Sequence, residues 1–385
     1  YNMLSILHLK ERGGVLFLLL CLICVMSHSG GMLTLFCIFC FCFLSKIRTL
    51  DSTAKTLLTF SVLYIFISII NGAITTFAGV LTYGLPWVIF YCYGKFIYNN
   101  AQSQKSIISL ILLLAFLSAF TIFVTIITKI ITTGQLVDVT RQFYFLGDES
   151  QETTGNGICL DIFIGFSGLA NYFCMKEYPQ QKKWFLFLFV LSILVPINVV
   201  TRTPIVVSVV CLMLCLMLKK KDKRTFGAIL IIIVAYCIII NSSDSSIKEI
   251  LDAYADRNEG ENIATASDRS YRWTDALMRM FVTPFGWYND KSSYVWVHNM
   301  WLDIAKYSGI IPFVLLVIPS VKSIINGLKL VKTTGTSLSF VLFNINICFI
   351  LSCFGQPLYG SLTAGLGCMI WGIQQAYLDQ INKMK

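Results

Sequence analysis

Charged side chains are scarce in this chain, and their scarcity excludes most classes of protein. They make up 13% of the 385 residues, whereas hydrophobic residues make up 56% and the mean hydropathy is +0.73. Because a soluble domain carries roughly 25% charged residues, an ordinary soluble protein is excluded. The apolar residues form repeated runs of about 20 residues, the length of a helix that crosses a bilayer. The sequence therefore predicts an all-α, polytopic membrane protein.

The motifs of several functional classes are missing as well. The sequence has no Walker-type phosphate loop, no HExxH zinc motif, no GxSxG nucleophile motif and no DxD-like acidic pair beside basic residues. A proton-coupled transporter keeps ionisable groups near the middle of the bilayer, but Asp161 and Asp303 lie near the ends of predicted spans. The net charge of +10 does not indicate nucleic-acid binding, because the basic residues are scattered through separate loops.

Histidine is rare, with three residues, while cysteine is frequent, with 14. The cysteines lie in or beside apolar runs, and the CxxC pair of Cys21 and Cys24 has no histidine or acidic companion. Zinc and redox sites need such companions. We interpret the cysteines as small hydrophobic residues and expect neither a metal nor a cofactor.

The charges of the loops predict the topology. With a cytoplasmic amino terminus, two thirds of the 30 Lys and Arg residues fall on the inner side and three quarters of the 20 acidic residues on the outer side. We expect about 12 spans with both termini cytoplasmic, the first span being retained because it lacks a small-residue cleavage site. The predicted spans are 13–28, 31–45, 56–72, 76–93, 106–128, 158–175, 184–199, 204–218, 226–240, 299–318, 338–355 and 360–378.

This topology divides the chain into three parts. Residues 1–240 carry nine spans and a smaller outer loop at 129–157, residues 241–298 form a large outer loop, and residues 299–385 carry three more spans. The large loop is expected to be partly helical, since two sets of its apolar residues have helical spacing. The sets are Ile247, Ile250, Leu251 and Tyr254, then Trp273, Leu277, Met280 and Phe281. Ser267 or Asp268 would cap the second helix, and Pro284 with Gly286 would end it.

Arg202 lies in a very short outer connection, Thr201-Arg202-Thr203-Pro204. One interpretation is an arginine that extends to lipid headgroups. The other is a phosphate clamp, because a guanidinium group offers a planar fork of donors and Pro204 begins a helix whose N–H groups face the same place.

Arg269 and Arg272 lie three residues apart at the start of the second loop helix, and so share one face of it. They could simply pair with neighbouring acidic residues. Together with Tyr271 and Trp273 they also suit a sugar phosphate, because the cations would bind phosphate and the aromatic rings a pyranose.

His298 stands where the large loop returns to the membrane, followed by Asn299 and Asp303. It could be an interfacial residue packed beside tryptophans. A neutral imidazole is also a good proton acceptor near pH 7, so His298 is a candidate general base.

The combined pattern resembles the bacterial O-antigen polymerase and O-antigen ligase family. The residues that carry the resemblance are Thr201-Arg202-Thr203, Arg269 with Trp273, Pro284-Phe285-Gly286, and His298-Asn-Met-Trp-Leu-Asp303 through Gly309-Ile-Ile-Pro312. They cover about residues 195–320; the rest of the chain resembles the family only in hydropathy and number of spans. Within the family, the chain is most similar to the polymerase branch.

The resemblance implies a metal-independent membrane glycosyltransferase of the GT-C type. It would sit in the bacterial inner membrane with its site facing the periplasm and use undecaprenyl-pyrophosphate-linked glycans as donor and acceptor. His298, Arg269 and Arg202 would be catalytic, and Arg272, Asn299, Asp303, Tyr271 and Trp273 would bind substrate. A chain-length regulator and a flippase would be partners. An O-antigen ligase remains an alternative, as does a flippase of lipid-linked oligosaccharides, which would instead need a cationic central cavity.

Overall fold

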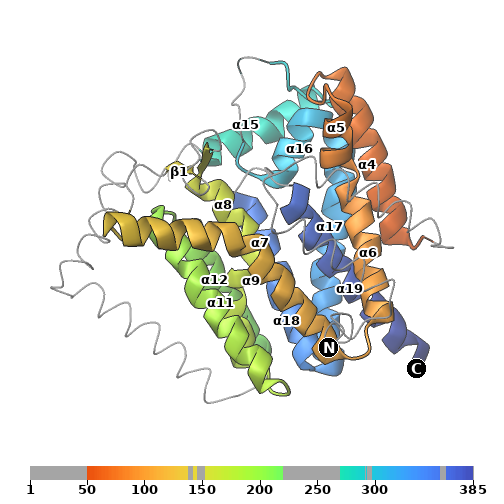
Figure 1. Ribbon diagram of the computed structural model, residues 1–385. Helices are drawn as coiled ribbons and strands as arrows, with labels where there is room; N and C mark the ends of the chain where they lie inside the picture. The colour runs from red at the N-terminus through yellow and green to blue at the C-terminus, as the bar shows by residue number, and fades with distance from the viewer. Residues whose placement is uncertain are drawn as a thin grey trace.

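The computed structural model describes residues 50–137, 142–144, 152–219, 269–290, 292, 297–355 and 361–384 (Figure 1). The predicted spans 13–28, 31–45 and 226–240, and the first predicted loop helix, lie outside these residues. Within the described residues the chain is helical except for one pair of short antiparallel strands. The all-α fold class is confirmed for this part of the chain.

The elements follow one another in this order. The first group is α4 (Ser52–Ile70), α5 (Phe77–Gly79), the π-helix η1 (Val80–Gly84), α6 (Pro86–Asn100) and α7 (Gln104–Thr133). Strands β1 (Gln142–Tyr144) and β2 (Glu152–Thr154) pair with Phe143 opposite Thr153. The next group is α8 (Gly155–Asp161), α9 (Phe163–Phe166), α10 (Gly168–Cys174), α11 (Pro179–Asn198) and α12 (Thr203–Leu218). The last is α15 (Arg269–Val282), α16 (Met300–Ser308), α17 (Ile310–Thr334), α18 (Ser337–Gly355) and α19 (Ser361–Met384).

Five of these helices, α4, α7, α11, α17 and α18, are long and apolar enough to cross a membrane. Residues 77–84 and 86–100 form a pair bent by 47° that would make a sixth span, and α12 is apolar but shorter. The prediction of a helical membrane protein is confirmed at this level. The total of about 12 spans stays a prediction.

Three predicted spans are wrong as single straight helices. The expected span 76–93 is divided among α5, η1 and α6, with a bend of 47°. The expected span 158–175 is divided among α8, α9 and α10, and the expected span 299–318 is divided at Gly309 between α16 and α17. Gly309 has a φ of 85°, and a Cβ atom there would lie 1.9 Å from the carbonyl oxygen of Pro284. Hydropathy does not detect such a break because the residues on both sides of it are apolar.

α6 and α19 are in close backbone contact. A Cβ atom on Gly94 would lie 2.0 Å from the carbonyl oxygen of Met369, and one on Gly372 would lie 2.0 Å from the carbonyl oxygen of Tyr91. Small residues of this kind let membrane helices approach until their backbones touch. This contact fixes α19 against the first part of the bundle.

Replacing Gly372 by alanine is expected to destabilise the folded protein by about 1–3 kcal/mol, because the added methyl group forces α6 and α19 apart. The measurement is thermal unfolding of the purified full chain in detergent. Gly327→Ala is the matched control, since its methyl group would meet side-chain atoms of Gln374 and Phe343 at 3.0 and 3.1 Å. Equal melting temperatures for Gly372→Ala and the unmodified protein would show that the close contact does not matter.

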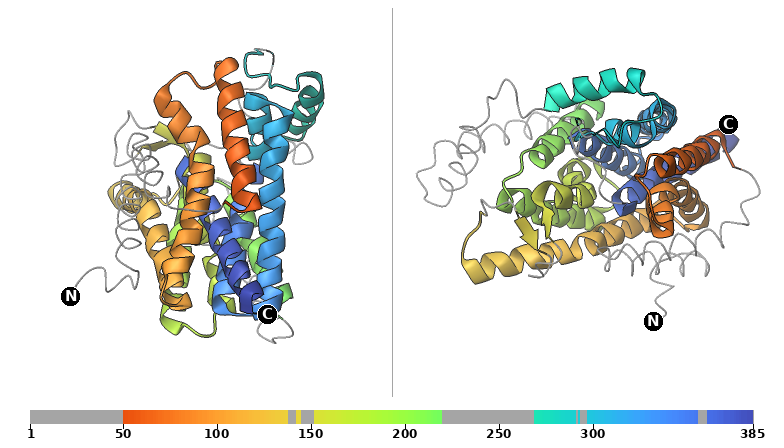
Figure 2. Two further views of the ribbon diagram at one scale, coloured as in Figure 1. Left: turned by 90° about the vertical axis from the view of Figure 1, so that its right-hand side faces the viewer. Right: turned by 90° about the horizontal axis from the view of Figure 1, so that it is seen from above.

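α18 lies inside the bundle and is almost entirely buried. Figure 2 shows it surrounded by other helices in the view from above. Two of its amides bond to neighbouring helices: Asn344 donates to Asn171 Oδ1 at 2.8 Å, and Asn346 accepts from the indole N–H of Trp371 at 2.7 Å. Interhelical hydrogen bonds between amides hold helices together inside a membrane.

The described cysteines occupy buried positions between these helices. Cys92, Cys159, Cys211, Cys348, Cys353 and Cys368 are free and buried, in keeping with the interpretation as small hydrophobic residues. The sulfur atoms of Cys174 and Cys215 lie in contact and connect α10 with α12. The sequence did not predict this pair, because its members are 41 residues apart.

Candidate functional site

α15 and α16 lie side by side at one end of the bundle, called the site end below (Figures 1 and 2). α15 confirms the second loop helix predicted from apolar spacing. Its buried residues Ala276 and Met280 pack with Trp287, Val297 and Leu302 in a small hydrophobic cluster. This cluster joins the loop helix to the segment that carries His298.

The turn that follows α15 is fixed to the break between α16 and α17. The backbone N–H of Ile310 donates to the carbonyl oxygen of Pro284 at 2.9 Å, and that of Trp287 donates to the carbonyl oxygen of Lys306 at 2.9 Å. Gly286 has a φ of 100°, a conformation that glycine adopts without strain. The Pro-Phe-Gly segment therefore ends α15, as predicted, and also anchors it.

Asn71, at the end of α4, completes this anchor. Its Nδ2 atom donates to the carbonyl oxygens of Phe285 at 2.7 Å and Tyr307 at 3.0 Å. Sequence reasoning missed Asn71 because its two partners lie 214 and 236 residues away. One amide thus ties a membrane-spanning helix to both sides of the anchor.

The side chains of Asn299 and Asp303 together fix the N-terminal end of α16 by accepting hydrogen bonds from backbone N–H groups around it. The Asn299 side chain accepts from the backbone N–H groups of Trp301 and Leu302, at 3.2 and 3.3 Å. The Asp303 carboxylate accepts from the N–H of Val297 at 2.9 Å and from that of Asn299 at 3.3 Å. The two side chains are 4% and 1% exposed. Such reciprocal capping satisfies the free N–H groups of a helix start, so these bonds hold the backbone on both sides of His298.

His298 is held in a strained conformation between these hydrogen bonds. Its φ is 60°, in the left-handed region that residues with a side chain seldom adopt. In the described part of the chain its Nδ1 atom is buried and makes no hydrogen bond. A polar ring atom that is buried without a partner costs free energy unless a ligand or a water satisfies it. Nδ1 of His298 is therefore an enclosed polar atom whose hydrogen-bonding capacity is unused in the described residues.

Burial, followed by the positive charges of Arg269 and Arg272, lowers the pKa of the His298 imidazole from 6.5 to about 4. The ring is therefore neutral at pH 7. The structure brings together the histidine and the pair of cations that the sequence placed 26 or more residues apart.

Arg202 belongs to the same end of the bundle, at the start of α12. A Cβ atom built on Gly355, the last residue of α18, would lie 2.8 Å from Cγ2 of Thr203 and 3.7 Å from a terminal nitrogen of Arg269. The Thr203 side chain and a terminal nitrogen of Arg269 therefore both lie beside Gly355. Thr203 belongs to the Thr201-Arg202-Thr203-Pro204 connection that the sequence singled out, whereas Gly355 was missed because nothing in the sequence marks it.

Backbone strain occurs in the segment before Arg202 and in the segment that carries His298. In the described residues, Val200 and His298 are the non-glycine residues with positive φ, 49° and 60°. A β-branched residue such as Val200 rarely adopts this conformation, and strain of this kind gathers at functional sites. Val200 lies two residues before Arg202. The strain therefore occurs in the two segments that the sequence selected for chemistry.

The two aromatic candidates have different surroundings. The indole N–H of Trp273 donates to the carbonyl oxygen of Val297 at 3.2 Å, so Trp273 supports the His298 segment. Tyr271 is 65% exposed on α15. Of the two rings, that of Tyr271 is the more accessible to a sugar.

Asp303 adds a second titratable group beside the histidine. Burial raises the pKa of its carboxyl to about 7, against the opposing effects of the backbone donors of Val297 and Asn299 and the charge of Lys306.

No group of three or more His, Cys, Asp or Glu side chains that could hold a metal occurs among the described residues.

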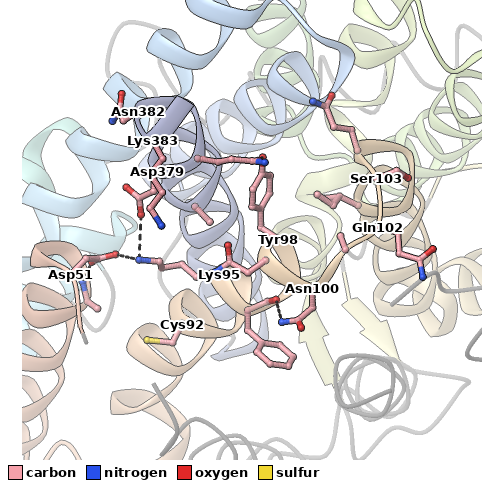
Figure 3. A pocket seen from close by; sticks show the side chains of 18 of the residues that line it. Asp51, Cys92, Lys95, Tyr98, Asn100, Gln102, Ser103, Asp379, Asn382 and Lys383 are labelled. Carbon is pink, nitrogen blue, oxygen red and sulfur yellow. Dashed lines mark hydrogen bonds and ion pairs between the residues drawn. The ribbon is translucent and has the colours of Figure 1, made fainter. Parts of the chain in front are cut away.

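A cavity of about 980 Å³ lies at the opposite end of α4 from Asn71, far from His298 (Figure 3). Figure 3 shows Lys95 between two carboxylates: it pairs with Asp51 at 2.5 Å and with Asp379 at 3.5 Å. The groups that carry the candidate chemistry do not line this cavity. We therefore treat it as separate from the site.

Comparison with known proteins adds no relative. No protein-family model matches the chain, and no curated protein is similar to it.

Proposed function

We propose that this protein is a metal-independent glycosyltransferase that moves a polyprenyl-pyrophosphate-linked glycan onto a sugar hydroxyl, and that it is an O-antigen polymerase. The observation that supports this most is the surroundings of His298: a strained, neutral imidazole with an unbonded nitrogen and two arginines acting on it. A base beside cations is what the displacement of a pyrophosphate by a hydroxyl requires.

In the proposed reaction, the hydroxyl oxygen of the acceptor sugar attacks the anomeric carbon of the donor. The bond from that carbon to the pyrophosphate oxygen breaks, and undecaprenyl pyrophosphate leaves with the electron pair. His298 takes the proton of the hydroxyl. Arg269 and Arg202, with Arg272, stabilise the negative charge that grows on the leaving group, often the largest contribution to catalysis.

The low pKa of His298 fits this reaction in a specific way. An imidazole with a pKa of about 4 is neutral but weakly basic. Its basicity is lowered in part by Arg269 and Arg272, so a bound pyrophosphate that neutralises these arginines would raise the pKa again. His298 would then become an effective base when the donor is in place. Without the donor, it would be too weak a base to activate water.

The remaining predicted residues take supporting roles in this proposal. Asn299 and Asp303 position His298 through the capping hydrogen bonds, and Trp273 does so through Val297. Tyr271, which is exposed, would stack on a sugar ring of the substrate. The acceptor would be a second lipid-linked repeat unit, and the site end would face the periplasm of the inner membrane.

The test is the glycolipid profile of a strain that lacks the gene, with and without complementation by the unmodified protein. We expect lipid A core capped by a single repeat unit and no ladder, because repeat units would still be ligated but not polymerised. Uncapped core with long glycans on undecaprenyl pyrophosphate would indicate a ligase instead. An unchanged profile would rule out both activities.

A further inference from the structure

α15 is apolar on two opposite faces. Ala276 and Met280 are 1% and 3% exposed and pack inward. On the opposite side, four large apolar side chains of α15 and its turn are mostly exposed. Met278 is 67% exposed, Phe281 70%, Val282 80% and Phe285 65%; these four residues are called the α15 patch. A contiguous apolar surface of this kind marks an interaction site.

The α15 patch adjoins the lipid-facing surface of the spanning helices. Phe285 is bonded through its carbonyl oxygen to Asn71, and the preceding residue Ile70, at the end of α4, is 67% exposed. On the other side, Ile310 at the start of α17 is bonded to Pro284, and the next residue, Ile311, is 50% exposed. α4 and α17 are both candidate membrane spans. The patch therefore continues the apolar surface of two helices that meet lipid.

Two charged residues of α15, Asp275 and Arg279, lie on its flank and pair with each other. Arg279 donates from Nε to Asp275 at 2.8 Å and also pairs with Asp290. An apolar face with charged residues along its edge is typical of helices that lie in the plane of a membrane interface. Figure 2, in the view from above, shows α15 at the outer edge of the bundle.

We propose that the α15 patch docks into the lipid leaflet at the site end of the bundle and holds α15 as an interfacial helix. Its apolar side chains enter the boundary between headgroups and acyl chains, about 5–10 Å deep for helices of this type. Arg269 and Arg272 at the other end of the helix then lie at the depth of lipid phosphates. The proposal does not depend on the glycosyltransferase reaction.

The experiment places a fluorescent coumarin amino acid at position 285, and separately at position 282, in the full chain reconstituted into phosphatidylcholine nanodiscs. Position 289 is the control, because Asn289 is exposed and polar and lies four residues beyond Phe285. Quenching is measured with nitroxide groups on the lipid acyl chains and with iodide in the water. Gel filtration of each labelled protein confirms that it folds.

We expect acyl-chain quenching at 285 and 282 to exceed that at 289 by about twofold or more, and iodide quenching to show the reverse order, as for a helix inserted below the headgroups. Iodide quenching at 285 as strong as at 289 would overturn the proposal, because the patch would then face water. Weak quenching by both agents at 285 and 282 would overturn it as well, because the patch would then be covered by protein.

Discussion

Replacing His298 by asparagine is expected to lower polymer formation by about 10²–10⁴-fold, the usual contribution of a general base. Asparagine tolerates the left-handed conformation that His298 adopts, so the segment should keep its backbone, but an amide cannot accept the proton. The measurement is the rate of chain extension by purified protein on lipid-linked repeat units. His298→Gly, which removes both strain and base, should be equally inactive.

The pH dependence gives this prediction a second readout. For the free enzyme the pKa of His298 is about 4, so protonation of His298 itself should not lower kcat/KM between pH 8 and pH 5; a decline near pH 7 would come from Asp303, whose carboxyl has a pKa of about 7. In the complex with the donor, the neutralised arginines raise the pKa, and the acidic decline of kcat should begin at a higher pH than that of kcat/KM. Full activity of His298→Asn, or coincident declines, would contradict a base tuned by Arg269 and Arg272.

Replacing Arg269 by alanine is expected to lower kcat by about 10²–10³-fold, because it removes a charge that stabilises the leaving pyrophosphate. Arg269→Lys should recover only part of this loss, since an ammonium group lacks the planar fork that binds two phosphate oxygens. Both variants are measured in the same chain-extension assay. In addition, the acid limb of kcat/KM should move to higher pH in Arg269→Ala, because one of the charges that lowers the pKa of His298 is gone.

Arg279→Ala is the matched control for this experiment. Arg279 lies on the same helix but is paired with Asp275 and Asp290 on its flank, and exposed ion pairs of this kind contribute about 0–1 kcal/mol. Its activity should stay within about threefold of the unmodified protein on that basis. If Arg279→Ala and Arg269→Ala lost activity equally, the effect would come from damage to α15 and not from phosphate binding.

Local patterns in the sequence predicted the parts of the structure that depend on neighbouring residues. The apolar spacing of Trp273, Leu277 and Met280 identified α15, and Pro284 with Gly286 identified its end. Asn299 and Asp303 were predicted beside His298, although their capping role became visible only with the backbone in place.

Features that depend on distant contacts could not be predicted. The break at Gly309 follows from a carbonyl oxygen of Pro284, and Asn71 is explained only by Phe285 and Tyr307. The strain at Val200 has no signature in residue type, since valine is usual in an apolar run. Each of these residues has its role because of contacts with residues that are distant in the sequence.

The burial of α18 has a consequence for the assembly of the protein in the membrane. In the most apolar stretch of α18, 89% of the residues are buried, so this helix has little contact with lipid in the finished protein. A newly inserted helix is surrounded by lipid, where Asn344 and Asn346 would lack the partners that α10 and α19 provide. Enclosing α18 gives both amides their partners, so the polar groups of this helix favour the assembled bundle over a helix left in lipid.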